Sequence, residues 1–196
     1  MSWTVEQLRT TGLARLGIVP WIDDFLGFMC ERPLFPGHVK ARLPKPGVFC
    51  YAPEDVIAAP GLLTHAKSLT SLASEYFGEP AHLWSLNAFV TRPDAGYWRG
   101  LHGLHSDVTT SNNAVGNKAL AFFVLGHDTD ITGAQLHVRP DGLIEPIFGP
   151  AGTCWLADQS HLHAGLIPEK PRLLLWARWA EKIPQAFFDE KLPVIP

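Results

Sequence analysis

The chain of 196 residues contains few cysteines, no cluster of basic residues and no long apolar run. Its 3 cysteines, Cys30, Cys50 and Cys154, are far apart and odd in number, which argues against a disulfide framework and favours a reducing compartment. The 16 basic residues are scattered and the net charge is −3, so we expect neither a nucleic acid nor an anionic membrane as a partner. The longest apolar runs, such as 119–125, are much shorter than a membrane span.

What remains is the composition of an ordinary globular protein. Hydrophobic residues make up 46% of the chain, enough to bury one sizeable core at this length. The N-terminal segment carries Glu6 and lacks the apolar stretch of a secretory signal. We therefore expect one domain, residues 1–196, in a soluble cytoplasmic protein. The sequence does not indicate its oligomeric state.

Residues 1–80 predict helical and irregular structure that supports the rest of the domain. Thr4 and Gln7 form a capping-box pattern, which predicts a short helix that ends near Gly12 or Gly17. Apolar residues at helical spacing predict a longer helix over 60–77. Weaker patterns predict a helical turn, irregular Pro-rich chain and a short strand at 20–26, 33–47 and 48–51.

After residue 80 the sequence changes character. Short segments rich in Val, Phe, Trp and Leu alternate with clusters of Gly, Pro, Asn and Asp, which is typical of an antiparallel sandwich or barrel. We expect a mainly β fold with N-terminal helices, in which residues 81–181 form a jelly-roll core. The eight expected strands are 82–91, 104–109, 118–126, 134–138, 143–148, 153–157, 161–164 and 172–180.

One of these strands contains the pair His105-x-Asp107. Residues i and i+2 of a strand point to the same side, so both side chains can bind one ion while Ser106 faces away. The spacing is common by chance, and the pair alone is weak evidence. A second histidine, His163, follows a predicted strand and tight turn. Two histidines and a carboxylate are a sufficient set to hold Fe(II) with one octahedral face open.

An arginine nine residues beyond His163 adds a second feature. In the strand 172–180, alternation puts Arg172 and Arg178 on the same face as Leu174 and Trp176. A buried face that carries arginines is costly unless an anion is bound there. A dicarboxylate cosubstrate such as 2-oxoglutarate would supply that anion, since arginine binds a carboxylate through two parallel hydrogen bonds.

With these motifs, the sequence resembles the phytanoyl-CoA dioxygenase-like branch of the Fe(II)/2-oxoglutarate oxygenases. The resemblance covers about residues 87–179 and implies a double-stranded β-helix, a jelly-roll and cupin-like core. It departs from the family at Asp141-Gly142, where Pro-Gly-Ser-His often occurs, and after His163. The motifs that carry the resemblance are Leu104-His-Ser-Asp107, Gly133 to Pro140, Gly152 to Gly165 and Pro171-Arg172.

The resemblance implies a role for each matching residue. His105, Asp107 and His163 are the expected iron ligands, and Arg172 is the expected anchor of the far carboxylate of 2-oxoglutarate. From alternation and proximity, we further expect two hydrogen-bonding residues and three aromatic residues at the cosubstrate pocket. These are Asn87 and Thr109, and Phe89, Trp98 and Trp176.

Two alternatives stay open in the sequence. His161 has the same parity as His163 and is a rival ligand. Arg178 is a rival anchor, because other branches of the superfamily place the arginine further downstream. The expected activity is oxidation, most simply hydroxylation, of a small molecule with consumption of O2 and release of succinate and CO2. The rival functions are a cupin-type metalloenzyme that does not use 2-oxoglutarate and a non-catalytic jelly-roll binding module.

Overall fold

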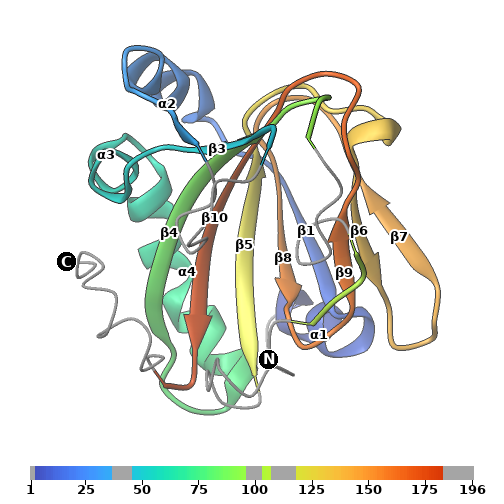
Figure 1. Cartoon of the computed structure of the whole chain (residues 1–196). Coiled ribbons are helices and arrows are strands. Elements are labelled where there is room, and N and C mark those ends of the chain that lie inside the picture. Colours follow the sequence, from blue (N-terminus) through green and yellow to red (C-terminus); the bar gives the residue numbers. More distant parts are fainter. Residues whose placement is uncertain (1–2, 37–45, 96–102, 107–117, 183–196) are drawn as a thin grey trace.

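The computed structural model describes residues 3–36, 46–95, 103–106 and 118–182 (Figure 1). Helices dominate the N-terminal part and strands the C-terminal part. The helices are α1 (Trp3–Thr11), α2 (Ile22–Met29), α3 (Pro53–Ala58), α4 (Leu62–Phe77) and the 3-10 turn η1 (Ile131–Gly133). The strands are β1 (Leu13–Ile18), β2 (Phe35–Pro36), β3 (Val48–Cys50), β4 (His82–Thr91), β5 (Ala119–Leu125), β6 (Gln135–Val138), β7 (Ile144–Ile147), β8 (Thr153–Asp158), β9 (His163–Gly165) and β10 (Arg172–Ala180).

The strands form two antiparallel sheets. The larger sheet has seven strands in the order β1-β8-β5-β10-β4-β3-β2, and the smaller has three in the order β7-β6-β9. The chain crosses repeatedly from one sheet to the other, so that strands distant in sequence become neighbours, as β10 does between β4 and β5. This arrangement confirms the predicted jelly-roll core.

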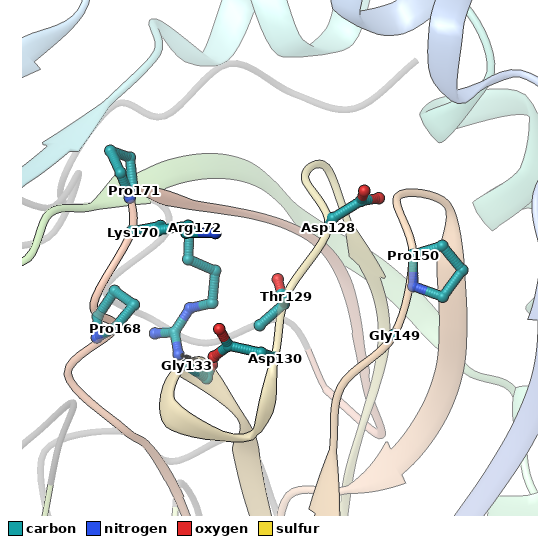
Figure 2. Close-up of a pocket in the computed structure, with 10 residues that line it drawn as sticks. All are labelled: Asp128, Thr129, Asp130, Gly133, Gly149, Pro150, Pro168, Lys170, Pro171 and Arg172. Carbon is teal, nitrogen blue, oxygen red and sulfur yellow. Dashed lines mark hydrogen bonds between the residues drawn. The ribbon is translucent and has the colours of Figure 1, made fainter.

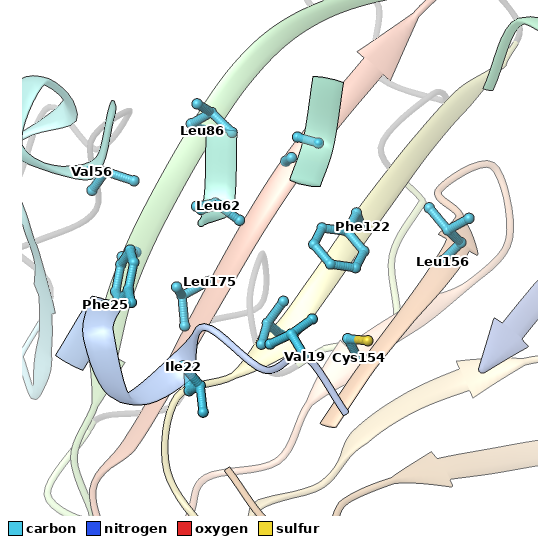
Figure 3. Close-up of a cluster of buried hydrophobic side chains, with 14 of the residues drawn as sticks. Val19, Ile22, Phe25, Val56, Leu62, Leu86, Phe122, Cys154, Leu156 and Leu175 are labelled. Carbon is cyan, nitrogen blue, oxygen red and sulfur yellow. The ribbon is translucent and has the colours of Figure 1, made fainter. Parts of the chain in front are cut away.

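The larger sheet separates two apolar cores. Side chains alternate along β10, so that Leu173 and Leu175 join the cluster beneath the helices while Leu174 and Trp176 join the cluster on the other face. Helices α2 and α4 cover the first face, and Figure 3 shows Leu175 among the helix residues of that cluster. The second cluster lies on the inner face, toward the smaller sheet, because it includes Ile147 of β7. The strand face that carries Arg172 is therefore the inner face.

Several N-terminal elements differ from the sequence prediction. The strand β1 was not predicted, although it pairs with β8 and extends the larger sheet. The short helix α3 was also missed; it begins at Pro53, a residue suited to a first helical turn. Helix α1 already includes Thr4, so Thr4 is not its N-cap. The N-terminal region thus contributes strands to the jelly roll as well as helices.

The long helix is close to its prediction. It spans Leu62–Phe77 and ends at Gly78, which adopts the left-handed conformation with φ of 78° that favours glycine at a helix C-terminus. The hydroxyl of Thr70 in this helix accepts a hydrogen bond from Trp179 Nε1 at 3.1 Å, which links α4 to β10. Among the described residues, no helix combines the length and apolar character that spanning a membrane would require.

Candidate metal and carboxylate site

The two predicted histidine ligands lie side by side. His105 and His163 form an isolated antiparallel bridge, in which each backbone N–H donates to the other residue's carbonyl, at 3.0 and 2.8 Å. Directly opposed residues of an antiparallel pair project to the same face. Their ring centroids are accordingly 4.3 Å apart. The structure therefore brings together two residues separated by 58 positions in the sequence, counted from 105 to 163.

The hydrogen bonds of both rings select one tautomer. His105 Nδ1 lies 2.8 Å from the Gly103 carbonyl, and His163 Nδ1 lies 3.0 Å from the His161 carbonyl. A carbonyl only accepts, so each Nδ1 carries a proton, and in the neutral ring Nε2 is then the nitrogen that can bind a metal. A backbone carbonyl behind the imidazole is the usual support of a metal-binding histidine. Both rings are thus set to present Nε2 to a cation.

The third expected ligand, Asp107, lies outside the described residues, as do Thr109 and Trp98. Its neighbour Ser106 is described: it is buried, and its hydroxyl donates to the Gln159 carbonyl at 3.3 Å. The part of the chain that the structure describes contains no group of three potential ligands that could hold a metal ion. The role of Asp107 therefore remains a prediction from the sequence.

The rival ligand His161 points elsewhere. Its ring stacks on that of His137, with centroids 5.5 Å apart and planes at 12°. Its Nε2 lies 3.9 Å from a carboxylate oxygen of Asp158, and its Nδ1 lies against Gly12 at the start of β1. This geometry favours His163 over His161 as the partner of His105.

The guanidinium of Arg172 is buried inside the protein, with 1% of the residue exposed. Burial lowers its pKa to about 10, so it remains protonated at neutral pH. Three neutral oxygens hold it: the carbonyls of Gly133 and Leu166, the second at 3.0 Å from Nη1, and the side chain of Gln135. None of the ion pairs among the described residues involves Arg172. Its charge is therefore buried without a counterion from the described chain.

One edge of this guanidinium is still available to an acceptor. The three oxygens surround Nη1, and Nη2 shares only the oxygen of Gln135. Nε is buried and makes no hydrogen bond within the described part of the chain. Nε–H and the outer Nη2–H form the side of the fork to which a carboxylate binds through two parallel bonds. The arrangement suits a carboxylate.

The spacing between this arginine and the histidines matches an extended dicarboxylate. A Cβ on Gly165 would lie 2.9 Å from Nη2 of Arg172, so the guanidinium rests directly on the backbone of β9. Gly165 follows His163 by two residues, or about 7 Å along a strand. Across the sheet, Gln135 pairs with Gly165 and His137 pairs with His163. The histidine rings therefore lie at one cross-strand pair of the smaller sheet, His137 with His163. The guanidinium lies against the next pair on the same face, Gln135 with Gly165.

Two cavities lie near the smaller sheet, and Arg172 lines the larger one. This pocket of 330 Å³ opens beside the guanidinium at the loops, lined also by Lys170, Asp128 and Asp130. Figure 2 shows the Arg172 side chain running from β10 toward Gly133 at the edge of this pocket. A smaller cavity lies between the sheets. Its lining comes from five strands and the turn after β8: Phe123, Gln135, Leu136, His137, Ile147, Trp155, Ala157, Gln159 and His163.

The remaining predicted site residues face the same interior. Asn87 is buried on β4 and donates from Nδ2 to Ser85 Oγ at 2.6 Å. Phe89 and Trp176 pack edge to face, with ring centroids 4.9 Å apart, and belong to the inner core. Arg178 is half-buried, and its guanidinium carbon lies 4.2 Å above the Trp176 ring. Arg172 contacts the smaller sheet at Gln135 of β6 and lies against Gly165 of β9.

The sequence interpretation missed two neighbours of His163. His137 is not among the predicted site residues, yet it is 1% exposed and lies beside His163 on the inner face. Burial lowers its pKa to about 4, and the nearby His161 and His163 lower it as well. Gln159, also 1% exposed, lines the same inner cavity, and its side-chain amide has no partner within the described residues. Only the alternation of β6 could have indicated that His137 faces inward.

No family model and no curated protein sequence matches this chain. Solved structures do match its fold. SnoN, a non-haem alpha-ketoglutarate-dependent epimerase from nogalamycin biosynthesis, is 15% identical, with a TM-score of 0.66 over 91% of this chain and 79% of that one. HygX from Streptomyces hygroscopicus, solved with nickel, 2-oxoglutarate and hygromycin B, is 14% identical, with a TM-score of 0.65 over 92% and 87%. A Pseudomonas putida prolyl-4-hydroxylase is 16% identical, with a TM-score of 0.65 over 91% and 97%.

These identities are too low to carry more than the fold. The chain has the double-stranded β-helix fold of these 2-oxoglutarate-dependent enzymes, as the sequence predicted. Its activity has to be argued from its own residues.

Proposed function

We propose that this protein is a non-haem Fe(II)- and 2-oxoglutarate-dependent dioxygenase that hydroxylates a small molecule, with release of succinate and CO2. We place it in the phytanoyl-CoA dioxygenase-like branch and in the cytoplasm. The observation that carries the proposal is the buried Arg172, which keeps its charge without a counterion from the described chain. Its guanidinium lies against Gly165, which is two residues along β9 from His163. A buried cation of this kind needs an anion to be favourable.

In this proposal, His105 and His163 bind the metal through Nε2, and Asp107 completes the set. Two imidazoles and one carboxylate suit Fe(II) and leave positions for a chelating 2-oxo acid and O2. When bound, the metal with 2-oxoglutarate and O2 supplies the oxidising power for a substrate C–H bond. The carbonyls of Gly103 and His161 keep both rings in the orientation that metal binding needs.

Arg172 would hold the far carboxylate of 2-oxoglutarate through Nε and Nη2. An extended five-carbon dicarboxylate spans about the distance between the histidine row and the Gly165 row. The aromatic residues of the inner cavity, Phe123 and Trp155, stack on each other with centroids 5.2 Å apart and give it an apolar wall. Next to apolar walls, the ionic contact of a buried arginine with a carboxylate is stronger than it is in water.

A small molecule is the substrate class that the chain favours. Two structural neighbours were solved with small molecules bound, HygX with hygromycin B and SnoN with nogalamycin RO. A further argument is the net charge of −3, which disfavours a nucleic acid.

The test is to add Fe(II) and then 2-oxoglutarate to the purified protein without oxygen. We expect the weak visible absorption band of the metal–2-oxoglutarate chelate, and its loss in His163→Ala. Metal binding without this band would favour the cupin-type enzyme that does not use 2-oxoglutarate. A protein that binds neither would be the non-catalytic jelly-roll module. Succinate formed in air with candidate small molecules would then identify the substrate.

A further inference from the structure

The side chain of Gln135 is the one side-chain partner of the Arg172 guanidinium among the described residues. With its amide oriented so that the oxygen faces the arginine, this oxygen accepts from Nη1 at 3.0 Å and from Nη2 at 3.1 Å. The opposite orientation would set the amide NH2 against the guanidinium donors, which is unfavourable. Gln135 therefore fixes the plane of the guanidinium from the β6 side.

All partners of this arginine are neutral, and this has a physical consequence. The carbonyls of Gly133 and Leu166 and the amide oxygen of Gln135 satisfy N–H groups without cancelling the positive charge. A carboxylate at position 135 would have nearly the same shape and would cancel that charge as a buried ion pair. The neutral amide holds the arginine and leaves its charge for a bound anion.

Gln135 also faces the space where that anion would lie. It lines the inner cavity together with His163, and it pairs across the sheet with Gly165, the residue on which Nη2 rests. Because the Gln135 oxygen accepts from both Nη1 and Nη2 of Arg172, the Nε side of the guanidinium remains for the ligand. The identity of residue 135 thus controls both the orientation and the net charge of the anchor.

We propose that Gln135 is a positioning residue that makes Arg172 selective for the distal carboxylate of a 2-oxo diacid. This inference rests on the proposed function and deepens it. According to this inference, Gln135, which is neutral and is not a metal ligand, makes the site prefer a 2-oxo diacid to a 2-oxo acid that has only one carboxylate. Gln135 itself is not one of the proposed metal ligands.

The experiment compares Gln135→Glu and Gln135→Met with the unmutated protein by titrating 2-oxoglutarate and 2-oxobutyrate into the anaerobic Fe(II) protein. 2-Oxobutyrate chelates the metal but lacks the distal carboxylate, so it reports on the metal site alone. We expect Gln135→Glu to weaken 2-oxoglutarate about 100-fold, because a buried carboxylate neutralises the anchor. Gln135→Met should weaken it about tenfold through loss of a hydrogen bond to a charged group. Neither variant should change the affinity for 2-oxobutyrate.

A matched control adds the same charge elsewhere on the smaller sheet. Ile144 is 55% exposed on β7, so Ile144→Glu introduces a carboxylate in solvent and should leave both affinities unchanged. A thermal melt of each metal-free variant confirms folding, and we expect Gln135→Glu to melt no lower than the unmutated protein because it compensates a buried charge.

The outcomes separate this inference from the proposed function. If the unmutated protein gives no chelate band, the proposed function fails. If it gives the band but Gln135→Glu binds 2-oxoglutarate as tightly as before, or if both ligands weaken equally, the inference about Gln135 fails alone. A purely structural role of Gln135 predicts that Glu, which is closer in shape and polarity, is tolerated better than Met. Our proposal predicts the reverse order.

Discussion

Arg172 lies so close to Gly165 that a Cβ on the glycine would be 2.9 Å from Nη2 and 3.0 Å from the side-chain amide of Gln135. Gly165→Ala should therefore push the guanidinium out of its position and weaken 2-oxoglutarate binding by about tenfold or more, since misplacing such a group by about 1 Å is costly. Titration of the anaerobic chelate band measures this. Gly27→Ala is the matched control: no atom lies within 4 Å of its Cβ, and it lies within α2. An unaffected Gly165→Ala would show that the arginine does not contact the cosubstrate.

The two arginines of β10 can be separated by paired substitutions. Arg172→Lys keeps a charge but loses the fork, and Arg172→Met loses both, so we expect 2-oxoglutarate affinity to fall about tenfold and about 100-fold or more. Arg178→Met should change it less than about threefold, because the Arg178 guanidinium lies over the Trp176 ring, six residues along β10 from Arg172. Equilibrium titration checks the order. Loss of binding in Arg178→Met with retention in Arg172→Met would move the anchor to Arg178.

Metal binding should distinguish His163 from its neighbour His161. Removing a ligand, in His105→Ala or His163→Ala, should weaken Co(II) binding more than about 100-fold, beyond what loss of a supporting contact costs. His161→Ala should retain most of the affinity, because that ring stacks on His137 instead. The visible spectrum of the Co(II) protein provides the readout. A loss in His161→Ala that equals the loss in His163→Ala would contradict the assignment.

Asp107→Asn tests the expected ligand that lies outside the described residues. We expect a loss of Co(II) affinity similar to that of the histidine variants, because an amide is a weaker ligand than a carboxylate.

The histidine pair and the arginine could be predicted from sequence because each depends on local alternation within a single strand or its adjacent turn. Asp107 shares that basis and is still a prediction.

Other parts of the structure depend on contacts that no local pattern records. The strand β1 has two buried and then mostly exposed residues, a bulge between Arg15 and Gly17, and a partner, β8, far along the chain. It therefore lacks the alternation that identifies a strand. The role of Gln135 arises only where β6 of one sheet meets the start of β10 of the other. A glutamine in a strand gives no local sign of such a contact.

The turn that delivers His163 is held by Asp158 at the end of β8. Its carboxylate accepts from the Tyr76 hydroxyl of α4 and from the Ser160 backbone at 2.8 Å. Burial beside this carboxylate raises the pKa of Tyr76, so the phenol stays protonated and donates. Tyr76→Phe should lower the free energy of unfolding by about 1–3 kcal/mol, the range for a hydrogen bond to a charged group. Urea unfolding measures it. Tyr51→Phe, half-buried near the same helices, is the control that should cost less.

The stability of the helical layer should depend on pH through His65. Its Nδ1 accepts from Trp21 Nε1 at 3.2 Å and its ring stacks on Phe122 at 4.9 Å, both of which need or favour the neutral imidazole. Burial lowers the pKa of His65 below its usual value near 6.5, so on acidification the unfolded chain binds this proton first. The contribution of His65 is therefore complete above about pH 6.5 and declines as the pH falls toward the lowered pKa of the folded state. Urea unfolding of the metal-free protein at pH 7 and at pH 5 measures this decline.

His65→Asn isolates this group from the other titrating residues. Asparagine offers Trp21 an acceptor that does not titrate, so the variant should lose less stability between pH 7 and pH 5 than the unmutated protein does. The site is remote from the metal ligands, because Trp21 and Phe122 both belong to the core beneath the helices, on the opposite face of the larger sheet from Trp176. The difference should therefore be the same with and without bound metal. Equal pH dependence in both proteins would show that the imidazole is already solvated in the folded state.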